Sequence, residues 1–234
     1  MADKFIFDVD GTLTPSRQKI DSEFEKFFLD FCDNHDVYLI TGSDYPKTEE
    51  QLGKTILQKV SRVYNCSGCD VWEKGINIKT DDWVLPEYAH HWLSEQLTFS
   101  NFHLRTGLHF EHRPGMVNYS IVGRNADVQQ RAEYVVWDEE QDERAYIAHN
   151  FNLLFPDLQA VVGGEISIDI FPKGSDKSQI ANQFDPKDIL YFFGDKQMPG
   201  GNDYPLKKII IDKDLGFCYN VNSYNETWAL LDEY

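Results

Sequence analysis

Apolar and polar positions near the start of the chain predict a strand, a helix and a second strand. Segment 4–11, KFIFDVDG, is a short apolar run of the kind buried on both faces of a parallel sheet, and it ends in a glycine turn. Segment 37–44, VYLITGSD, has the same character. Between them, a helix capped by Asp21 or Ser22 would present the apolar face Phe24, Phe27, Phe28 and Phe31. These elements form a βαβ unit.

Three further segments extend this pattern. A helix is predicted from about Pro46 to Val60, because proline and then two glutamates occupy its first turns. Far downstream, DILYFFGD at 188–195 is again typical of a buried strand that ends in Gly-Asp, and KIIIDK at 208–213 is interpreted as one more strand. We therefore predict the α/β class, with a doubly wound, Rossmann-like core built on a parallel sheet.

The middle of the chain has a different pattern. Alternation in HFEHR, MVNYSIVGR and GGEISIDIF predicts antiparallel strands, and helices are expected near 86–97 and 126–137. We interpret residues 79–174 as an inserted α+β cap domain that binds substrate, and residues 1–78 together with 175–234 as a catalytic core. The acidic run at 138–143 is most simply a solvated helix end or loop.

Composition narrows the class of protein. With 234 residues, 41% hydrophobic and 14% aromatic, the chain can bury a core, which excludes disordered and collagen-like proteins. Acidic residues outnumber basic ones by 39 to 22, a net charge of −17, which argues against nucleic-acid binding and adsorption to anionic membranes. No apolar run approaches the roughly 20 residues that span a bilayer. The first residues lack signal-peptide features, so we expect a soluble cytoplasmic protein.

One local feature runs against this acidity. From Thr80 to Pro172 there is no lysine, and the fixed positive charges are all arginines: Arg105, Arg113, Arg124, Arg131 and Arg144. Arginine offers a planar fork of donors that binds phosphate or carboxylate in two places, so the stretch indicates oxyanion recognition, with chance composition as the alternative.

Cysteine and histidine offer weaker candidates for a metal site. Cys66 and Cys69 form a CxxC pair, whereas a structural zinc usually needs four ligands, so ordinary reduced thiols are favoured over zinc or redox chemistry. The histidine pairs His90-His91 and His109-x-x-His112 lack ligand spacing, and surface or packing roles are favoured for them.

The strongest chemical signal is DVDGTLT at 8–14, directly after the first strand. Asp8 can attack phosphorus and become an aspartyl phosphate, while Asp10 can give a proton to the leaving oxygen and recover it later. Gly11 permits the turn that brings both acids inward. Shielding of the nucleophile calls for a hard divalent cation, and Mg²⁺ with oxygen ligands fits. The alternative is a surface turn with two acids.

Companion residues strengthen this interpretation. Thr41 or Ser43 could hold a phosphoryl oxygen, Lys177 could neutralise charge around the nucleophile, and Asp195 with the nearby Asn202-Asp203 could complete a magnesium site. Together with DVDGT they resemble the four motifs of the haloacid dehalogenase superfamily.

The middle of the chain is similar to the α+β, type C2b cap of the eukaryotic-type phosphomannomutases. The segments that carry this resemblance are DVDGTLTPSRQKI, GSDYPKTEEQLG, EHRPGMVNYSIVGR, GGEISIDIFPKGSDK and FFGDKQMPGGND. It implies a catalytic set of Asp8, Asp10, Ser43 and Lys177, and a Mg²⁺ site of Asp8, Asp195 and the backbone carbonyl of Asp10. It also implies a sugar phosphate bound by Arg17, Arg113, Asn118, Arg124, Arg131, Ser167 and Asp169.

The same resemblance implies a hexose 1,6-bisphosphate activator, a homodimer formed through the cap, and a place in GDP-mannose biosynthesis. The residues agree with the implied sugar-phosphate site, since Arg124 and Arg131 lie seven apart and would share a face of a helix. The chain departs from the family at Cys66-Ser67-Gly68, where a Glu-Asn-Gly turn is usual, at Pro114, and after Asn202-Asp203.

Three functions therefore stand. The leading hypothesis is a mutase that interconverts mannose 6-phosphate and mannose 1-phosphate, and it extends to the glucose isomers. A sugar-phosphate phosphatase, in which water resolves phospho-Asp8, shares the first half-reaction. A non-catalytic sugar-phosphate-binding protein is disfavoured, because it would not need Asp8, Asp10, Lys177 and Asp195 together.

Overall fold

The chain crosses between two compact units twice. The computed structural model describes residues 2–234, in which one unit runs up to Asp81 and resumes with Gly174–Tyr234, and the other is Asp82–Lys173. The sequence analysis placed these junctions at 78/79 and 174/175. The roles of catalytic core and substrate-binding cap stay predictions, and we use "core unit" and "cap unit" as names for the two parts.

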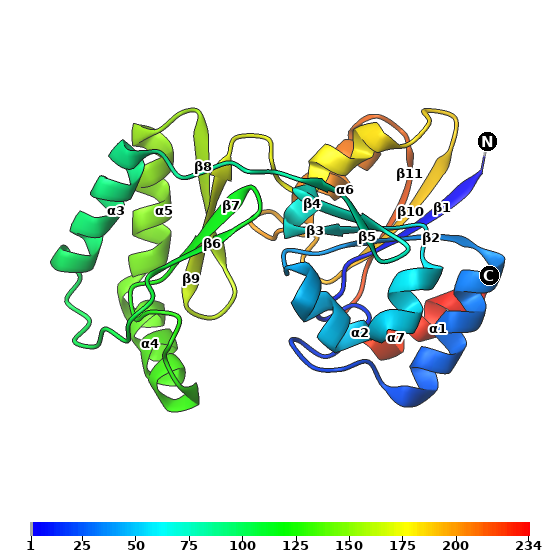
Figure 1. The fold of residues 1–234 in the computed structure, drawn as a ribbon, viewed down its shortest axis with the longest axis horizontal. Coiled ribbons are helices and arrows are strands. Elements are labelled where there is room, and N and C mark those ends of the chain that lie inside the picture. Colours follow the sequence, from blue (N-terminus) through cyan, green and yellow to red (C-terminus); the bar gives the residue numbers. More distant parts are fainter. Residues whose placement is uncertain (1) are drawn as a thin grey trace. The chain divides into compact units, whose positions relative to one another are not determined.

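The core unit is built on a seven-stranded sheet with the order β11-β10-β1-β2-β3-β4-β5 (Figure 1). Five neighbouring strands pair in parallel, which are β1 (Asp3–Phe7), β2 (Asp36–Ile40), β3 (Arg62–Asn65), β10 (Ile189–Gly194) and β11 (Gly216–Asn220). The antiparallel strands β4 (Asp70–Glu73) and β5 (Ile76–Thr80) complete one edge. In register, Phe7 of β1 lies beside Phe193 of β10, so the carboxyl ends of these two strands coincide.

Helices cover both faces of this sheet. One face packs against α1 (Ser22–Asn34), α2 (Tyr45–Lys59) and α7 (Tyr224–Leu231), and the other packs against α6 (Tyr204–Asp212) and the 3₁₀ segment η2 (Lys177–Gln183). Asp21 caps α1, as predicted, by accepting the backbone N–H groups of Glu23 and Phe24. Alternate residues of β1 divide between the two faces, which is the doubly wound arrangement expected from the βαβ pattern.

The prediction of a strand at 208–213 is wrong. Residues 208–212 belong to α6, whose C-cap is Lys213, and the last core strand is β11. Three consecutive isoleucines suggested a strand because β-branched residues favour sheets. Pro205 in the first turn and the buried pair Leu206 and Ile210, four residues apart, set the helical period instead.

The cap unit has an antiparallel sheet with the order β6-β7-β9-β8 and three helices. Its strands are β6 (Phe110–Arg113), β7 (Met116–Tyr119), β8 (Leu158–Gly163) and β9 (Ser167–Pro172), and its helices are α3 (Glu87–Phe99), α4 (Val128–Gln141) and α5 (Glu143–Leu154). The sheet and helices share one apolar core of their own. Helix α5 and strand β8 were not predicted.

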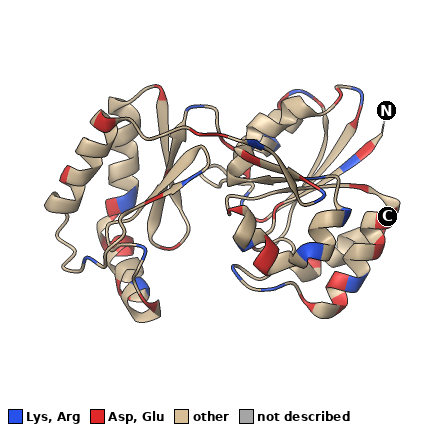
Figure 2. Ribbon diagram, viewed as in Figure 1, with Lys and Arg blue, Asp and Glu red and all other residues tan. Residues whose placement is uncertain are grey.

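The acidic run at 138–143 is only partly the solvated segment that was expected. Asp142 adopts a left-handed conformation between α4 and α5. Asp138, however, is buried, and its carboxylate accepts hydrogen bonds from the backbone and guanidinium of Arg144. Acidic residues otherwise lie over both units, as Figure 2 shows. Within residues 2–234, no helix has the length and apolar character needed to cross a membrane.

Candidate functional site

Three aspartates come together in the core unit, two of them just after the carboxyl ends of β1 and β10 and the third at the N-cap of α6. Asp8, Asp195 and Asp203 each offer a carboxylate oxygen, and these oxygens lie within 4.8 Å of one another. The backbone N–H of Asp8 donates to the carbonyl oxygen of Phe193 at 2.9 Å, which ties the turn after β1 to β10. Gly11 completes this turn with φ +81°, and a Cβ atom there would collide with the carboxylate of Asp195.

A buried lysine is bound between two of these acids. The ammonium of Lys177, at the start of η2, donates to Asp8 and, at 2.7 Å, to Asp203 Oδ1. The second oxygen of Asp203 accepts the backbone N–H of Lys196 at 3.0 Å. Asp203 thus anchors Lys177, a role that the sequence analysis did not separate from metal binding.

These groups perturb one another electrostatically. Burial raises the pKa of Asp8 to about 8, with Asp203 and Asp195 adding to the effect and Lys177 opposing it. Burial also raises the pKa of Asp195. For Lys177, burial lowers the pKa, but the carboxylates of Asp203 and Asp8 outweigh it and raise the pKa above its ordinary value.

The donor set fits a hard divalent cation. Three carboxylates share one ammonium, so negative charge exceeds positive charge in a largely buried place. Oxygen-only donors of this kind suit Mg²⁺. Asp203 uses both of its oxygens on Lys177 and Lys196, which leaves Asp8 and Asp195 as the better ligands. No other group of His, Cys, Asp and Glu within residues 2–234 has metal-binding spacing.

The Thr41–Ser43 loop follows β2 at the same end of the sheet. Thr41 is buried, and its hydroxyl accepts the backbone N–H of Ser43 at 3.1 Å. The loop is braced from β3, because the N–H groups of Cys66 and Ser67 donate to the carbonyl oxygens of Ser43 and Thr41 at 3.0 and 2.9 Å. Thr41 is therefore occupied in shaping the loop, and Ser43 is the less buried of the two hydroxyls.

The brace itself has unusual backbone geometry. Cys66 and Ser67 have φ values of 47° and 58°, in the left-handed region that residues with a side chain rarely adopt. The sequence departure noted at Cys66-Ser67-Gly68 thus falls on a strained segment that holds the Thr41–Ser43 loop. The four cysteines form no disulfide within residues 2–234, and burial raises the pKa of Cys69.

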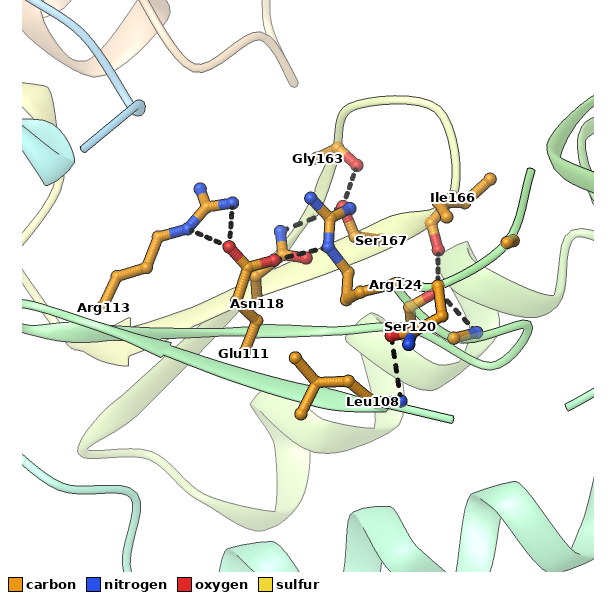
Figure 3. Close-up of polar contacts among 12 residues, drawn as sticks. Leu108, Glu111, Arg113, Asn118, Ser120, Arg124, Gly163, Ile166 and Ser167 are labelled. Carbon is orange, nitrogen blue, oxygen red and sulfur yellow. Dashed lines mark hydrogen bonds and ion pairs between the residues drawn. The ribbon is translucent and has the colours of Figure 1, made fainter. Parts of the chain in front are cut away.

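The cap unit contains a second polar cluster, of which Figure 3 shows Asn118, Ser167 and Gly163. Asn118 on β7 donates to Asp169 Oδ1 at 2.6 Å and to Ser167 Oγ at 3.0 Å, both on β9. Ser167 donates in turn to the carbonyl oxygen of Gly163 at 2.9 Å. A Cβ atom at Gly163 would overlap the Asp169 carboxylate, so glycine is required there by close approach. Burial raises the pKa of Asp169.

A glutamate that the sequence analysis did not single out joins two cap arginines. Glu111 on β6 accepts from the Arg113 guanidinium at 3.0 and 2.8 Å, and its other oxygen accepts from Arg124 Nε at 2.5 Å (Figure 3). Burial raises the pKa of Glu111, but the two arginines outweigh it and lower the pKa below its usual range. The β6–β7 register, in which Glu111 faces Asn118, is the signal that would have found it.

Arg124 and Arg131 do not share a helix, contrary to the prediction. Arg124 lies in the turn before α4, whose N-cap is Asp127. The two are nevertheless adjacent, because Arg131 donates to the carbonyl oxygen of Arg124 at 3.2 Å and to that of Ala126 at 2.9 Å. The seven-residue spacing correctly predicted that the two arginines lie close together. The reason is the contact between Arg131 and the Arg124 carbonyl, and not a shared helix face.

Two of the five cap arginines have structural roles. Arg105 donates to the carbonyl oxygens of Leu97, Ser100, Phe102 and Leu104. Arg144 pairs with Asp138. Oxyanion recognition therefore stays a prediction for Arg113, Arg124 and Arg131. In the core unit, Arg17 lies exposed on a loop, and its backbone N–H donates to Asp10 at 2.6 Å.

The chain matches one protein family over most of its length. The family model of eukaryotic phosphomannomutase matches residues 24–234. The phosphomannomutase of Saccharomyces cerevisiae is 31% identical over 244 residues, which cover 97% of this chain and 92% of that protein. The phosphomannomutase of Galdieria sulphuraria is 36% identical over 214 residues, which cover 86% of this chain and 83% of that protein.

Solved structures resemble the fold at lower identity. Plasmodium falciparum IMP-nucleotidase has a TM-score of 0.62 at 14% identity, covering 99% of this chain and 68% of that one. A haloacid dehalogenase-like hydrolase from Bacteroides thetaiotaomicron has a TM-score of 0.58 at 12% identity, covering 100% and 99%. At these identities the likeness concerns the fold alone. It confirms the predicted class, a Rossmann-like haloacid dehalogenase fold with an inserted cap.

Removal of the buried ammonium should destabilise the core unit. In Lys177→Met, Asp8 and Asp203 stay buried without their counterion, so we expect the free energy of unfolding at pH 7 to fall by about 3–5 kcal/mol. Urea unfolding measures this loss. Lys54→Met removes an exposed lysine and should change stability by less than about 1 kcal/mol. Equal losses in both variants would contradict the assignment.

Removal of Glu111 should strengthen anion binding by the cap unit. Its carboxylate occupies guanidinium donors that a phosphate would otherwise use. Glu111→Gln should bind inorganic phosphate roughly fivefold more tightly, or about 1 kcal/mol, in calorimetry with EDTA present. The exposed Glu139→Gln should leave phosphate binding unchanged. Weaker binding by Glu111→Gln would mean that the glutamate chiefly orients the arginines.

Proposed function

Because the chain belongs to the eukaryotic phosphomannomutase family, we propose that it interconverts mannose 6-phosphate and mannose 1-phosphate through an aspartyl phosphate. The observation that carries this proposal is the presence of two charged clusters in one chain, each of which would bind a phosphate, the first together with Mg²⁺. One is the Asp8–Lys177–Asp195 cluster of the core unit, and the other is the arginine cluster of the cap unit. A substrate with phosphate at both ends needs both.

Chemistry takes place at Asp8. Its carboxylate attacks the phosphorus atom, the bond from phosphorus to the sugar oxygen breaks, and Asp10 gives a proton to that oxygen. Lys177 neutralises part of the charge around the nucleophile, and the Ser43 hydroxyl donates to a phosphoryl oxygen. Asp8, Asp195 and the backbone carbonyl of Asp10 would hold Mg²⁺, which supplies positive charge beside the transferred group.

Transfer to the sugar runs the same steps in reverse. The mutase cycle starts from phospho-Asp8: the free hydroxyl of the bound sugar monophosphate attacks phospho-Asp8 and gives its proton to Asp10, so that the sugar becomes a 1,6-bisphosphate. The bisphosphate then returns its other phosphoryl group to Asp8, and Asp10 returns the proton. Protons and phosphoryl groups therefore balance over one cycle, and a hexose 1,6-bisphosphate would prime an enzyme that starts without phosphate.

The remaining site residues bind the distal part of the sugar phosphate in this proposal. Arg113, Arg124 and Arg131 bind the distal phosphate, and Arg17 in the core unit is a further residue proposed to bind the sugar phosphate. Asn118, Ser167 and Asp169 form a connected polar cluster suited to sugar hydroxyls, and the buried Oδ1 atom of Asn118 has no hydrogen-bond partner among residues 2–234. The proposal includes activity on glucose phosphates, a cytoplasmic location and a homodimer formed through the cap unit.

The deciding experiment is a coupled assay of mannose 1-phosphate isomerisation with Mg²⁺ and a hexose bisphosphate primer, run beside a measurement of free phosphate release. The parent protein should isomerise the sugar phosphate and release little phosphate. Asp8→Asn should lower isomerisation by at least roughly a thousandfold, because an amide is a poor nucleophile. Asp3→Asn, on the exposed start of β1, is the matched control. Phosphate release without isomerisation would establish a phosphatase instead.

The cap arginines should affect the two phosphates of the substrate unequally. Arg124→Ala or Arg131→Ala removes a charge-assisted contact to the distal phosphate, which costs roughly 1.5–3 kcal/mol, or about tenfold to a hundredfold in isomerisation. Cleavage of 4-nitrophenyl phosphate, which has no distal phosphate, should survive in the same variants. A parallel fall of both activities would assign the arginines to folding or to the chemistry at Asp8.

The Mg²⁺ requirement for activity should depend on the Asp195 carboxylate. EDTA should abolish turnover, and Asp195→Asn should raise the Mg²⁺ concentration needed for half-maximal activity on the order of tenfold to a hundredfold, since it removes a carboxylate ligand. Asp232→Asn, near the exposed end of the chain, should leave that concentration unchanged. Full activity of the parent protein in EDTA would exclude the magnesium assignment.

A further inference from the structure

Gln51 on α2 is a buried amide that contacts the residue assigned to proton transfer. Its side chain is only 2% exposed, and its Nε2 atom donates to Asp10 Oδ1 at 2.9 Å. The same nitrogen lies 3.1 Å from Thr14 Oγ1 and 3.4 Å from the carbonyl oxygen of Gln18. A carboxylate and a carbonyl can only accept, so the amide must present its nitrogen to them.

Two donors converge on one oxygen of Asp10. Besides Gln51, the backbone N–H of Arg17 donates to Asp10 Oδ1 at 2.6 Å. With Oδ1 occupied twice, Oδ2 is the oxygen left to carry the proton that Asp10 exchanges with the substrate. A carboxylate held in this way has one rotamer and one reactive oxygen, which is the preorganisation that general acid catalysis requires.

The backbone of Gln51 fixes the same loop. Gly53, two residues later, has non-helical backbone angles (φ 75°, ψ 158°), and the Gln51 carbonyl oxygen accepts the N–H of Ile20 at 2.9 Å. Lys47, one turn earlier on α2, donates to the carbonyl oxygen of Arg17 at 3.3 Å. Helix α2 therefore holds the loop that carries Arg17 as well as the Asp10 carboxylate.

We propose that Gln51 is a positioning residue, which binds Asp10 Oδ1 and thereby assigns proton transfer to Oδ2. In the forward step, Oδ2 gives its proton to the ester oxygen as the bond from that oxygen to phosphorus breaks. In the return step, Oδ2 takes a proton from the attacking hydroxyl or water. The proposal rests on the proposed function for the role of Asp10, and Gln51 itself does not touch substrate.

The test is the dependence of rate on the leaving group. Asp10 matters most for sugar oxygens, which leave poorly without a proton, and least for nitrophenolate, which leaves well as an anion. Gln51→Met keeps the side-chain length and removes the amide. We expect kcat/KM for mannose 1-phosphate to fall about tenfold or more, while kcat/KM for 4-nitrophenyl phosphate changes by less than about threefold. Phenyl phosphate should lie between them.

Gln58→Met is the matched control, because Gln58 is an exposed glutamine on the same helix. It should show the parent's rates with all three esters. Comparing esters within one variant also removes any effect of misfolded protein, which lowers every rate by the same factor. An equal fall for all esters in Gln51→Met, or no fall with mannose 1-phosphate, would overturn the proposal.

The outcomes for the parent protein keep this inference separate from the proposed function. Phosphate release from mannose 1-phosphate without isomerisation would replace the mutase by a phosphatase, and the leaving-group comparison would still decide the role of Gln51. A parent protein that releases phosphate from none of the three esters and does not isomerise mannose 1-phosphate would overturn both, since Asp10 would then have no proton to transfer.

Discussion

The core unit depends on the placement of one buried ammonium among acids. Parallel strands bring their carboxyl ends to one edge of the sheet, and here both β1 and β10 end in aspartates. Such acids repel one another in a place that excludes water, and burial, with this repulsion adding to it, raises the pKa of Asp8. The ammonium of Lys177 compensates part of this negative charge, and Asp203 holds Lys177 in place through an ion pair. The nucleophile, its neutralising charge and the candidate metal ligands are thus one electrostatic unit.

This constraint explains why small backbone features recur around the site. Gly11 is required because the Asp195 carboxylate fills the space of a side chain, and Gly163 is required in the cap unit for the same reason beside Asp169. The left-handed Cys66 and Ser67 direct their N–H groups at the Thr41–Ser43 loop. At Gly11, Cys66 and Ser67 the backbone adopts a positive φ so that polar groups can be held close together, whereas Gly163 contributes only the space that a side chain would fill.

Sequence patterns predicted the helices and strands whose hydrophobic periodicity was clear. They failed where tertiary packing decides between helix and strand. The strand before Asp8, the Asp21 cap and the spacing of the acidic motif are local features, so they could be read directly. Part of helix α6 was predicted as a strand, because three consecutive isoleucines favour strands. It is a helix, because burial of Leu206 and Ile210 against the sheet outweighs that preference.

The site residues that sequence reasoning missed share a different property. Glu111 and Gln51 act on other side chains, and their partners become visible only when strand register or the path of a loop is known. Nothing in the residue types distinguishes Gln51 from Gln58 on the same helix. Roles that come from direct chemistry at phosphorus have a signature in the sequence, whereas roles that come from orienting another residue do not.

The two clusters solve the same electrostatic problem with opposite signs. In the core unit an internal cation, Lys177, partly compensates acids, and in the cap unit an internal anion, Glu111, partly compensates arginines. Each cluster is therefore stable before a ligand arrives, which a set of bare buried charges would not be. A bound ligand then replaces or supplements the internal partner, Lys177 or Glu111, and no unpaired charge is newly buried. The affinity for the ligand therefore depends on the difference between the interaction with the ligand and the interaction with the internal partner. A moderate affinity of this kind suits a mutase, in which a bisphosphate must be held firmly enough to react and loosely enough to present its other end.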